Sequence, residues 1–368
     1  MYRDIILQII DAAINSKTLD LSNYINNQEF MRIMKEQTFL PFLYKVDKRK
    51  EFRKYYYQSC LIHEKFNEVG KIVDDILTQN NIPHVFLKGY ELQNLYPDPN
   101  LRMMGDIDVL VKPEDYKKAL QCLINNEFKA IDDSEKDYTL LYNNISIELH
   151  HKLFEDFRIL NEYFNKPFDN IKNKEKFKCE FDENYNFIYI FGHYAKHINM
   201  GAGLRELIDI YLLLQNKNLN IDYITSILKK FNLEKFFNMV LNELYLIFNY
   251  NSIKFTKNND VYKMIDYCLN CGIHGFGENS VQTQSTNFLN NFYNGNKFVY
   301  LFKKLFIPIK ELFKLYPWSK LIITIPFAYL FRFFYLLKNR RNKLKETILY
   351  KQDGTYKLLK SLDLMNKI

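Results

Sequence analysis

Two aspartates stand one residue apart in a short apolar run, and their spacing raises a chemical question. Asp106 and Asp108 lie in DIDVLV, residues 106–111, whose aliphatic and β-branched residues predict a strand. Alternate residues of a strand point to the same face, so both carboxylates share one face and the apolar residues share the other. Carboxylates about 7 Å apart repel each other and resist burial unless a positive group lies between them. A divalent cation is the natural candidate, and pairing with a nearby base such as Arg102 is the alternative.

A third carboxylate would allow two ions to be held together. Glu148 lies in ISIELH, residues 145–150, where apolar residues alternate with Ser146, Glu148 and His150. Mg²⁺ prefers oxygen ligands and usually keeps water and phosphate in its shell. Two such ions can activate an attacking hydroxyl and neutralise a leaving phosphate, so the pattern favours a two-ion magnesium site, with Mn²⁺ as the alternative metal. His150 could orient Glu148 or serve packing alone.

Helices and strands alternate around these carboxylates in an order that could position them. A helical pattern in residues 66–79 ends at two asparagines, and a short strand with a glycine turn follows in residues 83–89. The strand with the two aspartates comes next, and then a helix that begins after Pro113. Asn143 and Asn144 separate two strand-like runs and predict a tight hairpin turn.

The whole chain of 368 residues is too long for one compact core. We expect an α+β protein with a small mixed sheet flanked by helices and a mainly helical C-terminal part. The predicted division is an N-terminal helical cap in residues 1–62, a catalytic core in 63–178 and a helical domain in 179–368.

Composition and charge narrow the class of protein only slightly. A net charge of +8 over the whole chain favours an anionic partner, yet the basic residues are dispersed and form no nucleic-acid module. The five cysteines are odd in number and scattered, which indicates a reducing compartment. Cys268 and Cys271 form a lone CxxC that favours core packing over metal. The N-terminal residues show no secretory pattern, so we expect a cytoplasmic protein.

One segment raises the question of a membrane. Residues 318–337 are apolar and long enough to span a bilayer, but Lys320, Pro326 and Arg332 interrupt them. A buried or surface-lying helix is therefore favoured over a span. The wider stretch 298–341 interleaves aromatic and basic residues as interfacial helices do, which predicts peripheral membrane contact, and helices packed on a core are the alternative.

Several short motifs, taken together and in order, resemble a known family. They are LKGYEL at 87–92, YPDPNLRMMGDIDVLV at 96–111, PEDYKKALQCLINNEF at 113–128, IELHH at 147–151 and HYAKH at 193–197, followed by LRELIDIYLLL. This set is similar to the nucleotidyltransferase superfamily that includes DNA polymerase beta. Within it, the closest likeness is to the group of uncharacterised bacterial nucleotidyltransferases, over about residues 65–215.

The resemblance implies a set of roles for residues of this chain. Asp106, Asp108 and Glu148 would bind metal, and Glu148 would also deprotonate the acceptor hydroxyl. The residues implied in nucleotide binding are Lys88, Gly89, Arg102, Gly105, His193 and Lys196. The family's usual Gly-Ser or Gly-Gly turn is Gly89-Tyr90 here, so the serine contact to phosphate is missing and Lys88 or Arg102 would supply the charge.

Two kinds of function follow from these patterns. The first is metal-dependent transfer of a nucleoside monophosphate from an NTP, ATP among them, to a hydroxyl of a small molecule, protein or RNA, with release of pyrophosphate. The second is a catalytically weak module that binds a nucleotide or a partner, at a membrane and linked to surface polysaccharide assembly. His193 and His197 have metal-ligand spacing as well as packing spacing, and Arg205 and Asp209 predict an intrahelical ion pair.

Overall fold

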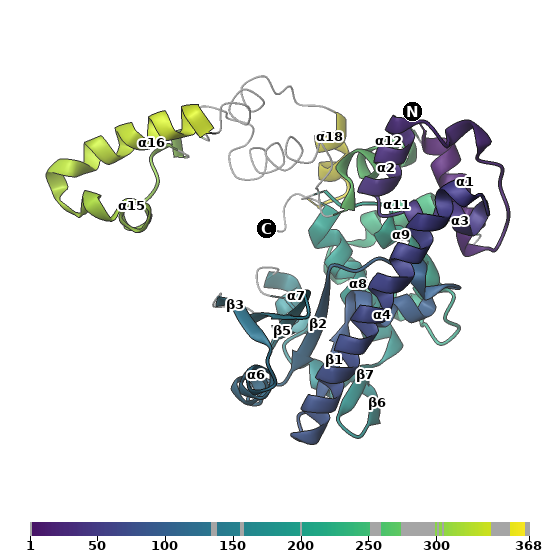
Figure 1. Ribbon diagram of the computed structural model, residues 1–368, viewed down its shortest axis with the longest axis horizontal. Coiled ribbons are helices and arrows are strands. Elements are labelled where there is room, and N and C mark those ends of the chain that lie inside the picture. The colour runs from purple at the N-terminus through teal and green to yellow at the C-terminus, as the bar shows by residue number, and fades with distance from the viewer. Residues whose placement is uncertain are drawn as a thin grey trace.

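The computed structural model combines one mixed sheet with many helices, as the sequence predicts (Figure 1). It describes residues 2–133, 138–154, 158–198, 201–250, 259–273, 299, 302–303, 305–339 and 354–364. The α+β class is therefore confirmed. The positions of the predicted strands 106–111 and 145–150 are confirmed as well.

The sheet has seven strands in the order β3-β4-β5-β2-β1-β7-β6, with β2 and its two neighbours at the centre. The strands are β1 (His84–Leu87), β2 (Asp106–Val111), β3 (Lys129–Asp133), β4 (Tyr138–Tyr142), β5 (Ile145–His150), β6 (Ile171–Glu175) and β7 (Lys178–Phe181). β2 runs antiparallel to β1 and parallel to β5. A central strand is buried on both faces, so any polar side chain on it must have a structural or chemical partner.

One face of the sheet lies against two helices and forms a compact apolar cluster. α4 (Lys50–Gln79) and α6 (Tyr116–Asn125) contribute residues such as Val73 and Leu123 to it. Ile107, Val109 and Val111 of β2 belong to the same cluster. The alternation of β2 therefore buries its apolar residues on the α4 side and turns its two aspartates to the opposite face.

The hairpin between β4 and β5 sets the register of the third carboxylate. Asn143 and Asn144 both have positive φ, 49° and 64°, which a two-residue hairpin turn requires. β5 then pairs with β2 so that Glu148 lies opposite Asp108. The predicted hairpin is confirmed, and its register places the two carboxylates on adjacent strands at the same level of the sheet.

The other helices form a second and larger core on the opposite side of the sheet. They include α1 (Arg3–Ile14), α2 (Gln28–Glu36), α3 (Leu40–Val46), α7 (Arg158–Tyr163), α8 (Glu183–Ile198), α9 (Arg205–Leu214), α10 (Ile221–Lys230), α11 (Glu234–Phe248), α12 (Asn259–Cys271) and α18 (Gly354–Ser361). α1 contacts α11 and α12, so the N-terminal helices pack on helices from the second half of the chain. α4 runs unbroken across residue 62, and the division into three domains stays a prediction.

Cys268 and Cys271 belong to the buried face of α12, and neither forms a disulfide. Their placement favours the packing interpretation of the CxxC. Among the described residues, the side chains close enough together to hold a metal ion are Asp108, Glu148 and His150, and the two cysteines are not part of that group.

The second core also contains a carboxyl group with no partner. Glu243 of α11 is fully buried, and neither of its oxygens has a hydrogen-bond partner among the described residues. Burial raises its pKa well above the ordinary value, so the folded protein holds this proton more tightly than the unfolded chain does. The unfolded chain releases the proton above about pH 4.3, and stability therefore falls as pH rises beyond that point.

We expect Glu243→Met to raise the free energy of unfolding, because it removes this unpaired polar group. The gain should be on the order of 1–3 kcal/mol at pH 8 and smaller at pH 5, where the unfolded chain keeps more of its protons. Urea unfolding at both pH values measures it. Glu64→Met on the exposed face of α4 is the matched control and should change little. A variant that is destabilised at pH 8 would contradict the expectation.

Two helices in the last quarter of the chain carry many of the exposed large apolar side chains. α15 (Ile309–Leu315) and α16 (Ile325–Asn339) are joined by two short 3₁₀ helices, Pro317–Lys320 and Ile322–Thr324. Aromatic contacts hold this hairpin together, among them Tyr316 with Phe331 at 5.7 Å between ring centroids. In the part of the chain that the structure describes, no helix is both long and apolar enough to cross a bilayer.

Candidate active site

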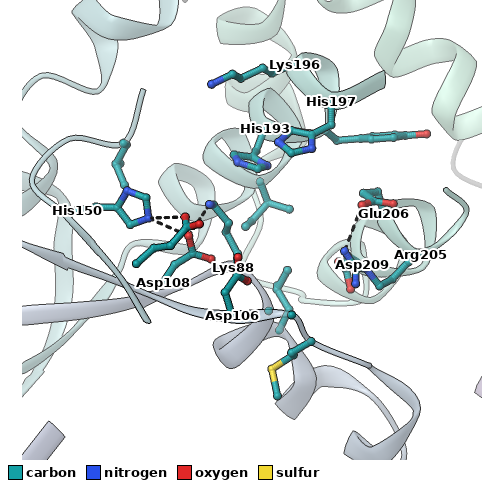
Figure 2. A pocket seen from close by; sticks show the side chains of 18 of the residues that line it. Lys88, Asp106, Asp108, His150, His193, Lys196, His197, Arg205, Glu206 and Asp209 are labelled. Carbon is teal, nitrogen blue, oxygen red and sulfur yellow. Dashed lines mark hydrogen bonds and ion pairs between the residues drawn. The ribbon is translucent and has the colours of Figure 1, made fainter. Parts of the chain in front are cut away.

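A cavity of about 460 Å³ lies between the sheet face that carries the aspartates and helices α8 and α9 (Figure 2). Seven parts of the chain line it: α5 (Lys88–Leu92), the loop before β2, β2 itself, β5, residues 152–154 after β5, and the two helices α8 and α9. All the residues that the sequence predicts for the site line this one cavity. They are Lys88, Gly89, Arg102, Gly105, Asp106, Asp108, Glu148, His193 and Lys196. Their roles stay predictions.

Asp108 is the most enclosed acidic group of the cavity, with a side chain that is only 3% exposed. Its Oδ1 accepts hydrogen bonds from Lys88 Nζ at 2.6 Å and from His150 Nε2 at 2.8 Å. Burial alone would raise its pKa, but the positive charge of Lys88 and the bond from His150 outweigh burial and hold the pKa well below the ordinary value. Asp108 is therefore ionised at every physiological pH.

Asp106 behaves differently although it lies on the same strand face. Burial, together with the nearby negative charges of Asp108 and Glu148, raises its pKa to about 6, although the positive charge of Lys88 acts in the opposite direction. Two carboxylates that lie close together cannot both ionise easily without a cation. The pKa values of Asp106 and Asp108 therefore diverge, because Lys88 and His150 contact Asp108, whereas burial and the neighbouring carboxylates act on Asp106.

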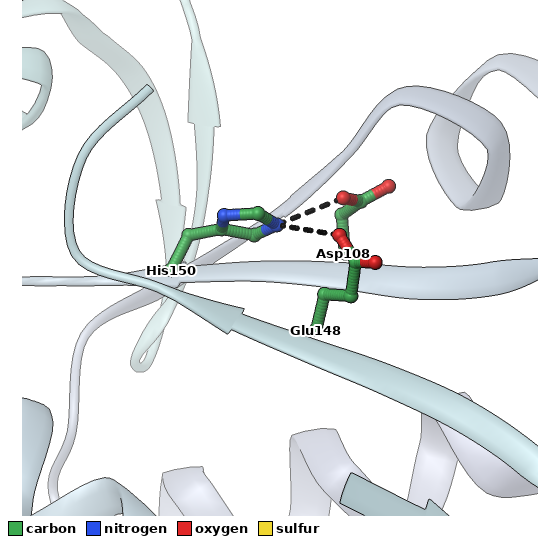
Figure 3. Close-up of side chains that lie close together, drawn as sticks. All are labelled: Asp108, Glu148 and His150. Carbon is green, nitrogen blue, oxygen red and sulfur yellow. Dashed lines mark hydrogen bonds and ion pairs between the residues drawn. The ribbon is translucent and has the colours of Figure 1, made fainter. Parts of the chain in front are cut away.

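Glu148 and His150 complete a group of possible metal ligands with Asp108 (Figure 3). One ligand atom from each of the three lies within 4.8 Å of the others, and His150 Nε2 is 3.5 Å from Glu148 Oε2. Two carboxylate oxygens and one imidazole nitrogen are a donor set that divalent metals accept. The sequence predicts Asp106, Asp108 and Glu148 as the ligands; in the structure Asp106 lies outside this group of three.

The sequence did not indicate His150 as a possible metal ligand. The strand alternation already placed it on the polar face, two residues after Glu148. The parallel pairing of β5 with β2 then brings its ring to Asp108, because His150 lies opposite Leu110, two residues beyond Asp108 along β2. A pattern of Glu-x-His on the strand next to the Asp-x-Asp strand was the available signal.

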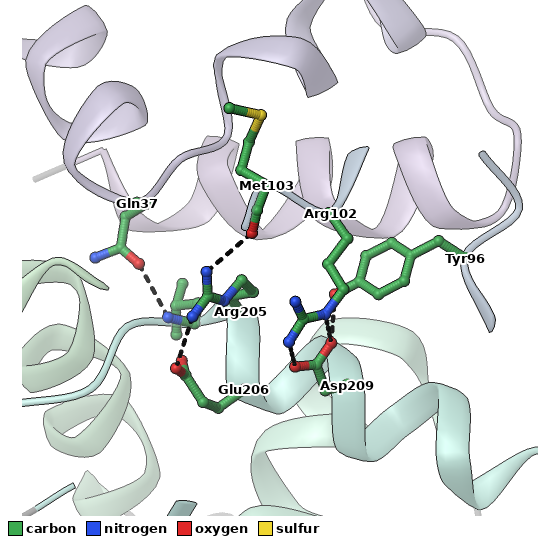
Figure 4. Close-up of polar contacts among 8 residues, drawn as sticks. Gln37, Tyr96, Arg102, Met103, Arg205, Glu206 and Asp209 are labelled. Carbon is green, nitrogen blue, oxygen red and sulfur yellow. Dashed lines mark hydrogen bonds and ion pairs between the residues drawn. The ribbon is translucent and has the colours of Figure 1, made fainter. Parts of the chain in front are cut away.

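Arg102 is held by a residue far away in the sequence (Figure 4). Its Nε and Nη2 donate to the two carboxylate oxygens of Asp209 at 2.9 and 2.7 Å, and both side chains are almost fully buried. Tyr96 donates a third bond to Asp209 at 2.8 Å. The predicted Arg205–Asp209 pair is therefore wrong. Asp209 faces the loop before β2, where a buried guanidinium compensates its charge.

Arg205 instead contacts the same loop at another point. Its Nη1 donates to the carbonyl oxygen of Met103 at 3.0 Å, and its Nη2 lies 3.5 Å from Glu206 Oε1. Burial raises the pKa of Glu206, which lines the cavity with Arg205. α9 is therefore tied to the loop before β2 by two arginines from opposite sides, and this connection fixes one wall of the cavity.

Gly89 lies in the first turn of α5, directly against the Arg102 guanidinium. A Cβ at this position would lie 2.7 Å from Arg102 Nη1 and 3.3 Å from Met104 Cγ. Real side chains do not approach so closely, so the glycine is needed for the packing of Arg102. The resemblance implies that Gly89 contacts the triphosphate. The structure gives a separate reason for a glycine here, because a side chain would collide with Arg102.

We expect Gly89→Ala to destabilise the protein by about 1–3 kcal/mol, the usual cost of overpacking a buried site. Arg102 cannot move aside easily because Asp209 holds its other two nitrogens. Thermal unfolding measures the effect. Gly105→Ala is the matched control, since nothing lies within 4 Å of its added Cβ. Equal stability of Gly89→Ala and the wild type would show that the guanidinium is free to shift.

Tyr90, which replaces the usual serine, does not point into the cavity. Its ring packs on Phe86 with centroids 4.6 Å apart, and its hydroxyl end lies over Gly70 of α4, where a Cβ would be 2.3 Å away. The side chain thus belongs to the core on the far side of the sheet. The backbone of the turn, and not the residue-90 side chain, faces the cavity.

His193 and His197 of α8 form the wall opposite the carboxylates (Figure 2). Their rings stack with centroids 4.2 Å apart. Burial lowers the pKa of His193 well below the ordinary value, and the charge of Lys88 lowers it further, so this imidazole is neutral at physiological pH. Lys196 on the same helix and Lys152 after β5 add ammonium groups to the lining. Lys152 was not predicted from the sequence.

Comparison with known proteins supplies one match. A family model described as an uncharacterised nucleotidyltransferase matches residues 26–249, which is more than half of the chain. The matched region contains every residue of the cavity described above. No curated protein and no solved structure matches the chain.

Proposed function

The chain belongs to the family of uncharacterised nucleotidyltransferases, and we propose that it is a metal-dependent enzyme of the polymerase-beta-like superfamily. It transfers a nucleoside monophosphate from an NTP to a hydroxyl acceptor and releases pyrophosphate. One observation carries this proposal: Asp106 and Asp108 of β2 and Glu148 of β5 converge in the same cavity. The family match and the convergence are independent, because the match says nothing about side-chain positions.

The residues present fit a divalent metal. Asp108, Glu148 and His150 offer two oxygens and one nitrogen close together, and Asp106 lies next to them on the strand. A bound divalent cation would stabilise the charge that develops on the transferred phosphoryl group and lower the pKa of the acceptor hydroxyl. An imidazole in the donor set suits Mn²⁺ as well as Mg²⁺.

In the proposed reaction the acceptor oxygen forms a bond to the α-phosphorus, and the bond from that phosphorus to pyrophosphate breaks. Glu148 accepts the proton of the acceptor hydroxyl, because it is the most exposed carboxylate of the ligand group at 34% and can reach a substrate. Lys152 and Lys196 line the cavity and have no carboxylate partner among the described residues. We assign them to the triphosphate, since Lys88 and Arg102 each already contact an aspartate.

A transfer assay tests the proposal. The protein is incubated with the four α-³²P-labelled NTPs, Mg²⁺ or Mn²⁺, and a cell extract as the source of acceptor. Label should move to an acceptor with the wild type and not with Asp106→Asn. Asp75→Asn on the exposed face of α4 is the matched control and should transfer normally. Absence of transfer by the wild type, combined with metal-dependent NTP binding in calorimetry, would favour the catalytically weak binding module instead.

A second proposal concerns the exposed surface of the α15–α16 hairpin. Large apolar side chains stand out from it, and Leu321 and Ile323 at its tip are 71% and 83% exposed. The other exposed members are Phe306, Ile309, Leu315, Trp318, Phe327, Leu330, Phe331, Phe333, Phe334 and Tyr335. So many large apolar side chains exposed on one hairpin mark it as a candidate interaction site.

Charge favours an anionic membrane surface as the partner of this hairpin. Lys310, Lys314, Lys320 and Lys338 are exposed on the hairpin, and Glu311 is the exposed carboxylate among its described residues. Basic residues beside exposed aromatic and aliphatic residues are typical of helices that lie in a membrane interface. We therefore propose peripheral membrane attachment through the hairpin, as the sequence pattern of residues 298–341 predicts.

Vesicle sedimentation tests the attachment. The protein should sediment with vesicles that contain phosphatidylserine, and the bound fraction should fall in high salt or with neutral vesicles. Replacing Trp318, Leu321 and Ile323 with serine should abolish sedimentation. The same replacement at Leu61 and Ile131, which are also exposed, should leave it intact. Equal binding of both variants, or no binding of the wild type, would overturn the proposal.

A further inference from the structure

Lys88 forms an ion pair with the most enclosed carboxylate of the cavity, Asp108. Its ammonium group lies 2.6 Å from Oδ1 of Asp108, the same oxygen that accepts a hydrogen bond from His150. The Lys88 side chain is 22% exposed and that of Asp108 is 3% exposed, so little water screens the contact. In Figure 2 the nitrogen of Lys88 reaches into the group of carboxylates and not toward the opposite wall.

The backbone holds Lys88 in this position. Leu87, the residue before it, lies opposite Asp108 in the pairing of β1 with β2, so Lys88 leaves the strand next to the carboxylate. Lys88 itself has a φ of 49°, which residues other than glycine rarely adopt. Such a conformation persists only where the surrounding structure enforces it. The backbone of the turn between β1 and α5 therefore holds the Lys88 side chain against Asp108.

The charges of the group balance with a single divalent ion. Asp106, Asp108 and Glu148 together bring three negative charges, while one divalent cation and the Lys88 ammonium bring three positive ones. The convergent ligand atoms come from Asp108, Glu148 and His150 and define one metal position. Asp106 lies outside that group, and both Asp106 and Lys88 line the same cavity.

We propose that Lys88 takes the place of the second metal ion, so that the site binds one divalent cation through Asp108, Glu148 and His150. The ammonium group supplies positive charge at Asp108, on the strand face that also carries Asp106. This inference rests on the proposed function, and it replaces the two-ion arrangement that the sequence predicts.

Manganese binding tests the inference directly. Bound Mn²⁺ is counted by equilibrium dialysis with and without an α,β-methylene NTP, and the ions are examined by electron paramagnetic resonance. The wild type should bind one Mn²⁺ per chain and show no coupling between ions. Lys88→Ala should bind two, with the coupled spectrum of ions about 3.5–4 Å apart. Lys88→Arg, which keeps the charge, should bind one.

Matched controls and the contrary outcomes separate this inference from the proposed function. Lys117→Ala, an exposed lysine of α6, should behave as the wild type, and thermal unfolding reports whether each variant is folded. Two coupled ions in the wild type would overturn the inference, and so would a single ion in folded Lys88→Ala. Either result with normal transfer activity leaves the proposed function intact. One ion in the wild type without any transfer would overturn the function alone.

Discussion

Asp108→Asn is expected to lower the rate of nucleotidyl transfer by roughly 1,000-fold or more. Asparagine has the same shape but lacks the charge, so a metal bound with Glu148 and His150 loses an anionic ligand. Several kcal/mol of transition-state stabilisation depend on such a ligand, and each 1.4 kcal/mol is about tenfold in rate. The rate is measured with saturating NTP and an extract that supplies the acceptor.

Two further measurements make the result for Asp108→Asn interpretable. Lys88 loses the carboxylate that compensates its charge, so thermal unfolding must show that the variant is folded under assay conditions. Mn²⁺ affinity should fall together with the rate. Asp75→Asn should change neither quantity. A folded Asp108→Asn protein with wild-type transfer would mean that the cavity is not the site of the reaction.

Arg102→Met is expected to reduce the free energy of unfolding by about 3–5 kcal/mol. The substitution leaves Asp209 buried without its charge partner, and removal of one member of a buried ion pair costs this much. Urea unfolding gives the value without reference to activity. The double variant Arg102→Met with Asp209→Leu should regain much of the loss, because it removes the uncompensated charge as well.

An exposed pair provides the control for this experiment. Arg32 and Glu36 lie one turn apart on α2 with a 2.8 Å contact, and the side chain of Arg32 is 39% exposed. Arg32→Met should cost less than about 1 kcal/mol, since water screens a surface ion pair. Similar losses from Arg102→Met and Arg32→Met would contradict the structural role that we assign to Arg102.

Local periodicity explains which parts of the site could be predicted from the sequence. The alternation of DIDVLV fixes the face of Asp106 and Asp108, and the alternation of ISIELH does the same for Glu148. Two asparagines mark the hairpin because they tolerate positive φ. These features depend on residues close together in the chain, and the structure confirms the strands, the hairpin and the α+β class.

Contacts between distant residues account for what the sequence did not reveal. Arg102 and Asp209 are 107 positions apart, and the spacing of Arg205 and Asp209 pointed to a local pair instead. The side chain of Tyr90 turns away from the cavity because Gly70 of another helix makes room for it. The contact of Lys88 with Asp108 depends on a backbone conformation that no residue preference predicts.

A crystal structure with Mn²⁺ and a non-hydrolysable NTP is the decisive experiment for the proposed metal and nucleotide site, because the anomalous signal of manganese locates the ion independently of the protein. We expect an anomalous peak among Asp108, Glu148 and His150, with the triphosphate in the same cavity near Lys152 and Lys196. A nucleotide bound elsewhere, or an ion that does not contact Asp108, would contradict the proposed site.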